Sequence, residues 1–148
     1  MTESEWLGRD KPVEMLSFLR QTMAGRKDAR RKIRLWLAAC CRQVWPRLKN
    51  RRSRELIEAS ERYADGEVSF GELKALWDAH RAKVGRRTWG AYLAWGAAHR
   101  DVWQGAVESW ATLSARPPAL PDREMAALFR DVFGNPFRQV QIDESWLR

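Results

Sequence analysis

The chain has 148 residues, with 27 Lys and Arg against 19 Asp and Glu, and a formal net charge of +8. This length allows one domain, or one domain with an appendage, and an apolar content of 45% suits a folded protein rather than a disordered one. The longest apolar run, residues 35–41, is far shorter than the roughly 20 residues of a membrane helix, so we expect no membrane partner.

The N-terminus and the cysteines point to a reducing compartment. The N-terminus is acidic and lacks the apolar segment of a secretory signal. Cys40 and Cys41 are neighbours, so they cannot join distant segments in a disulfide framework. We therefore expect a cytoplasmic protein.

Helical periodicity dominates the first half of the chain. Apolar residues recur at three- and four-residue spacing and predict a helix from Pro12 to Gly25. A second helix is predicted over residues 27–48, with Pro46 ending or kinking it. A third is predicted from Ser53, which is a good N-cap, to Gly66.

The next two predicted helices depend on a capping motif and a repeat. Ser69 and Glu72 have the spacing of a capping box and predict a fourth helix that ends at Gly85. Over about residues 88–114 a seven-residue repeat predicts one long helix packed against others. The repeat is marked by Trp89, Trp103 and Trp110. Gly96 takes the place of another tryptophan in this repeat, which would let a second backbone or a tryptophan ring come close.

Prolines separate the last predicted helix from the rest. Residues 116–121 contain three prolines and predict a semi-rigid spacer, after which a helix runs from Asp122 to Gly134. We predict an all-α fold, a compact bundle of five or six helices with a proline-hinged C-terminal helix and a short irregular tail. Residues 1–116 would form the bundle, and residues 117–148 would form the linker, helix and tail packed on it.

Short sequence motifs carry a family resemblance. They are EWL at 5–7 with ML-x-FLR at 15–20, ACCR-x-x-W at 39–45 with ERYADG at 61–66, and LFRDVFGNPFR at 128–138 with SWL at 145–147. In these stretches the chain resembles a family of hypothetical proteins from planctomycete bacteria. The resemblance implies a helical protein with a variable middle rich in Ala and Trp, and it implies no activity and no catalytic residues.

Positive charge is concentrated in one part of the chain. Between Arg20 and Arg54 there are 13 basic residues and a single acidic one, Asp28, so the remainder of the chain is net acidic. A basic ridge of this kind can follow a phosphate backbone. The leading hypothesis is therefore a non-catalytic module that binds nucleic-acid backbone (RNA or DNA), as a small subunit of a nucleoprotein assembly would. The predicted phosphate contacts are Arg30, Arg31, Arg34, Lys49, Arg51 and Arg52.

Two other interpretations of the basic residues stay open. They could dock an acidic protein surface, or they could form a solvated face that pairs with acids of the next helix, such as Glu55, Glu58 and Glu61. The alternative function is a protein–protein adaptor, in which the tryptophan-rich long helix meets a partner helix and an oligomer can form. Its predicted interface residues are Trp45, Trp95, Trp103 and Trp110, of which Trp45 and Trp95 lie off the apolar stripes and are expected to be exposed.

Catalytic and cofactor motifs are not found. The cysteines and the two histidines, His80 and His99, lie on apolar helical faces and are expected to be core residues. The sequence has no glycine-rich phosphate loop, no nucleophile elbow and no group of ligands with zinc spacing. We therefore expect no enzyme, no metal and no cofactor.

Overall fold

The computed structural model describes residues 1–85, 87–115, 118–138 and 145. These residues form eight α-helices and one 3₁₀ turn, and they contain no strand. The helices are α1 (Glu3–Gly8), α2 (Pro12–Met23), α3 (Lys27–Gln43), α4 (Arg51–Ala64), α5 (Phe70–Lys83), α6 (Trp89–Ala97), α7 (Val102–Ser114) and α8 (Asp122–Phe133). The fold is all-α, as predicted.

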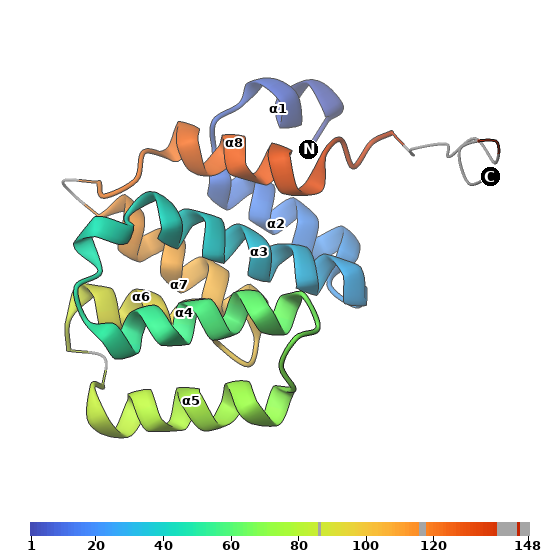
Figure 1. The fold of residues 1–148 in the computed structure, drawn as a ribbon. Helices are drawn as coiled ribbons and strands as arrows, with labels where there is room; N and C mark the ends of the chain where they lie inside the picture. Colours follow the sequence, from blue (N-terminus) through green and yellow to red (C-terminus); the bar gives the residue numbers. More distant parts are fainter. Residues whose placement is uncertain (86, 116–117, 139–144, 146–148) are drawn as a thin grey trace.

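The helices lie in layers, which Figure 1 shows from the side. At one end α1 lies beside α8, and α2 and α8 pack against each other. Helix α8 also packs on α3, and α2 on α7. Next come α4 and α6, and α5 forms the outermost layer at the other end, packed mainly on α4. Helices α3 and α4 run antiparallel, so the N-terminal end of α3 meets the C-terminal end of α4.

One hydrophobic core joins the last helix, α8, to α2 and α3. The ring of Trp36 on α3 stacks on Phe129 of α8, with centroids 3.9 Å apart and planes 5° apart. Its indole Nε1 donates a hydrogen bond of 3.0 Å to the carbonyl oxygen of Met125. Beyond α8, Phe137 stacks on Phe18 of α2 at 5.1 Å. Helix α8 is thus an integral part of the core.

The prediction of five or six helices was too low for two reasons. The short α1 was missed, although Thr2 caps it by accepting a hydrogen bond from the backbone N–H of Glu5. The single helix predicted over residues 88–114 is in fact α6 and α7. Asp101 begins the second of these by accepting hydrogen bonds from the N–H groups of Trp103 and Gln104, so the seven-residue repeat spans a turn.

Two glycines let α6 and α7 pack closely. A Cβ atom placed on Gly105 would collide with the carbonyl oxygen of Gly96, and one placed on Gly96 would lie 2.6 Å from Oγ of Ser109. The backbones of the two helices are therefore close enough to exclude a methyl group. This is the close approach of a second backbone that the gap in the tryptophan repeat suggested.

The second and third helices differ from their predicted bounds by a few residues. Helix α3 ends at Gln43, and Pro46 lies in the 3₁₀ turn Trp45–Arg47 that follows it. Helix α4 begins earlier than predicted, because the side chain of Asn50 caps it by accepting from the N–H of Ser53. Among the helices that the structure describes, none combines the length and the apolar character needed to span a membrane.

Candidate functional site

A cationic groove of about 900 Å³ lies where α3 begins and α4 ends. We call it the basic groove. Its walls hold six cationic side chains and one acidic side chain, together with two aromatic rings. The lining residues are Arg26, Lys27, Asp28, Arg30, Arg31, Arg34, Tyr63, Ala64, Gly66, Val68, Phe70, Arg100 and Val102.

Three helix N-termini also face the basic groove. Lys27 is the first residue of α3, Phe70 the first of α5 and Val102 the first of α7, and all three line the groove. The N-terminal end of a helix carries a partial positive charge of roughly half an elementary charge. The N–H groups at the start of α5 and α7 are already capped by Ser69 and Asp101, and Asp28 lies in the first turn of α3, so the side chains supply most of the positive potential.

Arg34 is the most unusual cation of the groove. It is only 5% exposed, and its guanidinium lies over the ring of Tyr63, 5.1 Å from the ring centroid. Nη2 donates a hydrogen bond of 3.2 Å to the carbonyl oxygen of His99, whereas the buried Nη1 has no hydrogen-bond partner among the described residues. Burial lowers the pKa of this guanidinium, although an arginine stays charged at neutral pH. An unpaired buried charge is costly and favours an anion beside it.

The other groove cations divide into paired and unpaired groups. Arg26 forms two hydrogen bonds with Asp28, at 3.2 and 2.9 Å. Arg31 caps α4, since its Nε donates to the carbonyl oxygen of Ala64 at 2.7 Å and Nη2 lies 3.4 Å from Asp65. In the described part of the chain no carboxylate pairs with Lys27, Arg30 or Arg100.

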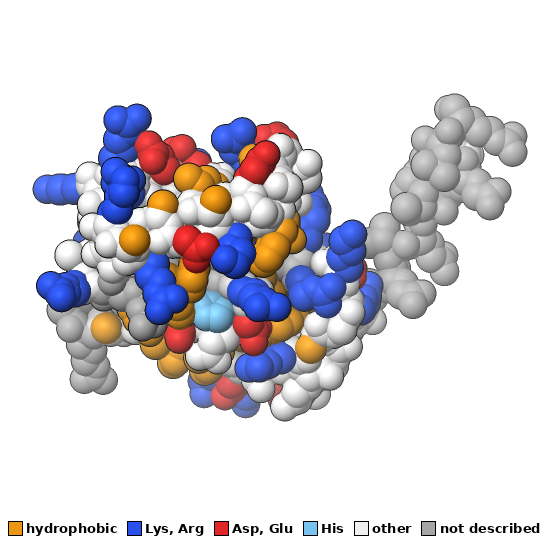
Figure 2. Space-filling model, turned by 90° about the horizontal axis from the view of Figure 1, so that it is seen from below, with side chains coloured by type: hydrophobic (Ala, Val, Ile, Leu, Met, Phe, Trp, Pro, Cys, Tyr) orange, Lys and Arg blue, Asp and Glu red, His pale blue; other side chains and the backbone are white. Residues whose placement is uncertain are grey.

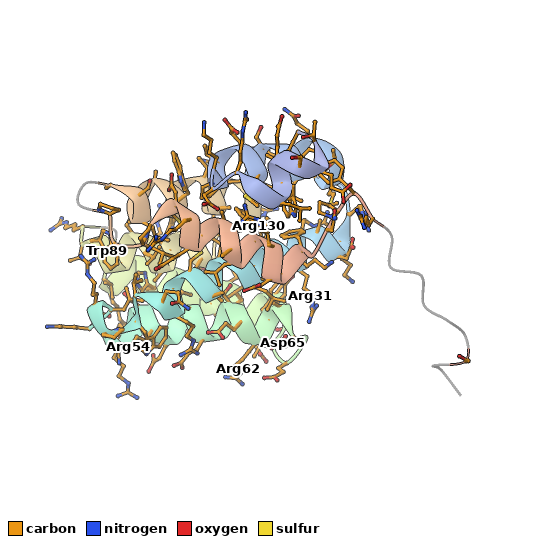
Figure 3. All side chains as sticks on the ribbon, turned by 90° about the horizontal axis from the view of Figure 1, so that it is seen from above. Arg31, Arg54, Arg62, Asp65, Trp89 and Arg130 are labelled. Atoms are coloured by element: carbon orange, nitrogen blue, oxygen red, sulfur yellow. The ribbon has the colours of Figure 1, made fainter. Side chains whose placement is uncertain are left out.

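The structure brings together only half of the predicted phosphate contacts. Arg30, Arg31 and Arg34 share the basic groove, but Lys49, Arg51 and Arg52 lie at the opposite end of the α3–α4 hairpin. In Figure 3, Arg31 and Asp65 mark one end of this hairpin and Arg54 marks the other. The 17 residues of α3 separate the two ends by about 25 Å. The sequence does not show this separation, because the two groups are close along the chain.

Several cations outside the groove bind other groups of the same chain. Arg42 and Arg54 lie over the ring of Trp45, at 4.1 and 5.2 Å from its centroid. Arg54 also donates hydrogen bonds to the carbonyl oxygens of Leu48 and Trp45. Arg42 pairs with Glu61 at 2.8 Å, and Arg51 pairs with Glu55 at 2.8 Å. This part of the basic run therefore holds the α3–α4 connection in place.

The four tryptophans of the predicted partner interface do not form one exposed surface. Trp95 was expected to be exposed, but it is only 9% exposed, because it packs edge-on to His99 and against the ring of Trp77. Trp103 is 5% exposed. Trp45 is half-buried beneath two guanidinium groups, and Trp110 is half-buried, with its Nε1 donating to Asp122 at 3.3 Å.

The cysteines and His80 lie in the core, as expected, whereas His99, also expected there, is half-buried. Both thiols are buried, and burial raises the pKa of Cys41 to about 12 and that of Cys40 well above its usual value. His80 is buried, and its Nε2 lies 3.0 Å from Oγ of Ser53. Within the described residues, no group of three or more His, Cys, Asp or Glu side chains is arranged to hold a metal ion.

The sequence analysis named only Arg30, Arg31 and Arg34 among the groove residues, and it missed the cation and the two aromatic rings that other elements contribute. Tyr63, Phe70 and Arg100 come from α4, α5 and the α6–α7 turn, each far from α3 along the chain. Tyr63 lies in the ERYADG motif of the family resemblance, and this motif was a sequence feature that could have marked it as a candidate. No periodicity marks Arg100, because it lies in the turn that the sequence analysis did not predict.

Comparison with known proteins gives no relative for this arrangement. The chain matches no family model, no curated protein and no solved structure. The resemblance to the planctomycete family therefore stays a prediction.

Proposed function

We propose that this protein binds the phosphate backbone of nucleic acid in the basic groove, without catalysing a reaction. The observation that carries the proposal is that three exposed cations, Lys27, Arg30 and Arg100, line one hollow and pair with no carboxylate among the described residues. A phosphate in the groove would supply negative charge to these exposed cations.

The proposed interaction differs from that of a solvated basic face. A solvated face would have its cations spread over open surface or paired with nearby acids, as Arg51 is with Glu55. Here, unpaired cations converge from α3 and the α6–α7 turn into one hollow. Backbone binding of this kind releases counterions, so affinity should fall steeply with salt and depend weakly on base sequence.

Charge reversal at two positions tests the proposal. Lys27 and Arg30 are exposed, so the double variant Lys27→Glu/Arg30→Glu should fold normally. We expect it to lose at least about tenfold in affinity for a labelled oligonucleotide at low salt. The matched control is Lys49→Glu/Arg52→Glu, which changes the net charge equally at two exposed residues outside the groove. It should bind nearly as well as the parent protein.

Three outcomes would contradict the proposal. The first is an equal loss in both variants, which would mean that overall charge and not the groove drives binding. The second is the absence of binding at low salt. The third is binding of polyglutamate as tight as that of the oligonucleotide, which would assign the groove to acidic protein surfaces instead.

A further inference from the structure

A second pocket adjoins the basic groove and differs from it in chemistry. It measures about 320 Å³ and is lined by Phe70, Leu73, Lys74, Trp77, Asp78, Arg81, Ala98 and Arg100. Phe70 and Arg100 line both hollows, so the two lie side by side. We call the second one the aromatic pocket. A ligand held in the basic groove can therefore extend into it.

The boundary between the two hollows is an exposed aromatic ring. Phe70, the first residue of α5, is 42% exposed and meets the edge of Tyr63 with ring centroids 6.0 Å apart. Tyr63 also lies beneath the guanidinium of Arg34. The buried cation, the tyrosine and the phenylalanine thus follow one another from the basic groove toward the aromatic pocket.

The interior of the aromatic pocket suits a flat, polar ring. Trp77 is half-buried against Trp95, with ring centroids 5.5 Å apart, and the guanidinium of Arg81 lies 5.9 Å from its centroid. The indole Nε1 of Trp77 is buried without a hydrogen-bond partner among the described residues. The part of Trp77 that lines the pocket can therefore offer a base an aromatic surface for stacking.

The outer surface on the side of α5 carries hydrophobic, cationic and acidic side chains. Figure 2, which views the molecule from the side of α5, shows Lys and Arg side chains placed among hydrophobic ones. Cationic tracks with interleaved aromatic rings are the usual surface for single strands, since cations follow the backbone while rings stack on bases. In a duplex the base faces are covered by their neighbours and cannot reach a pocket ring.

We infer that the ligand of the basic groove is single-stranded nucleic acid, with one unstacked base held against Phe70 and Trp77 in the aromatic pocket. This inference rests on the proposed function, because the phosphate contacts of the groove place the strand beside the pocket. The charge of the groove provides sequence-independent attraction, and the pocket provides the preference for unpaired bases.

The test compares single-stranded with duplex ligands by fluorescence anisotropy. The probes are oligothymidylate and oligouridylate of about 12 nucleotides, and a DNA duplex of the same length. We expect both single strands to bind at least about tenfold more tightly than the duplex. Phe70→Ala should weaken single-strand binding by about five- to 150-fold, the range measured for the loss of one stacked base, and leave duplex binding unchanged. Phe70→Trp should retain single-strand binding.

A matched control lies on the same helix. Leu76 on α5 is 43% exposed, almost as much as Phe70, and it lines neither hollow. Leu76→Ala should bind single strands as the parent protein does. Circular dichroism and thermal unfolding of the three variants establish that each is folded.

The outcomes separate this inference from the proposed function. Salt-sensitive binding that is equally tight for duplex and single strands would overturn the inference and leave the phosphate groove in place. An equal loss of affinity in Phe70→Ala and Leu76→Ala would also overturn it. No binding of any probe at low salt would overturn both.

Discussion

Replacing Gly105 with Ala should separate α6 from α7 and destabilise the protein. The added Cβ would collide with the carbonyl oxygen of Gly96 and lie 2.8 Å from Cβ of His99. The carbonyl belongs to the backbone and cannot rotate away, so the helices themselves must move. Added methyl groups in a packed interior cost about 1–3 kcal/mol, and this site should lie at the upper end of that range. The better helix propensity of Ala returns about 1 kcal/mol.

The expected net loss is about 2 kcal/mol in the free energy of unfolding. For a chain of this size it corresponds to a fall of about 4–8 °C in Tm, which calorimetry or circular dichroism resolves. Gly71→Ala is the matched control. It also replaces a helical glycine, but its Cβ would meet only Oγ of Ser69, at an ordinary 3.8 Å. This variant should be neutral or slightly more stable. Unchanged or increased stability in Gly105→Ala would refute the close packing of α6 on α7.

Three other predictions concern buried side chains. Trp36→Ala should cost about 3–5 kcal/mol in urea unfolding, because it removes the stacking on Phe129 and the bond to Met125, and a loss below about 1 kcal/mol would contradict this assignment. Cys40 and Cys41 should react with a thiol reagent only after unfolding, since both are buried and the pKa of Cys41 is raised to about 12. Rapid reaction of the native protein at about pH 8 would contradict the burial of these thiols. Burial lowers the pKa of His80 in the folded protein below its usual value of 6.5, so the unfolded chain binds a proton there more readily. The stability that is present above about pH 6.5 should therefore be lost as the pH falls toward the lower pKa of the folded protein. The drop in Tm between about pH 7.5 and 5.5 should be smaller in His80→Gln than in the parent, and equal drops would contradict this role of His80.

Local signals in the sequence predicted the helices that carry their own start and stop residues. The capping box of Ser69 and Glu72 is present, with both of its reciprocal hydrogen bonds, and α5 begins directly after it. Such motifs involve residues three apart, so they can be recognised without knowing the fold. Helix α7 also begins with an N-cap residue, Asp101. Because the tryptophan repeat continues across this turn, the sequence predicted one helix where there are two.

The candidate site could be predicted only in part. The density of positive charge at the start of α3 indicated Arg30, Arg31 and Arg34. Which of these cations are free depends on partners that packing brings from elsewhere. Arg31 donates a hydrogen bond to a carbonyl oxygen at the end of α4, and Arg34 is buried against Tyr63. These contacts join residues more than 25 positions apart along the chain, a distance at which sequence periodicity carries no information.

The salt dependence of binding tests the central claim most directly, namely that the cations of the basic groove contact phosphates. The logarithm of the affinity for oligothymidylate is measured against the logarithm of salt concentration for the parent protein, Arg30→Gln and Arg52→Gln. Loss of one phosphate contact should reduce the slope by about 0.7 for a single strand in Arg30→Gln, and the slope should stay unchanged in Arg52→Gln. Identical slopes in all three proteins would contradict the account.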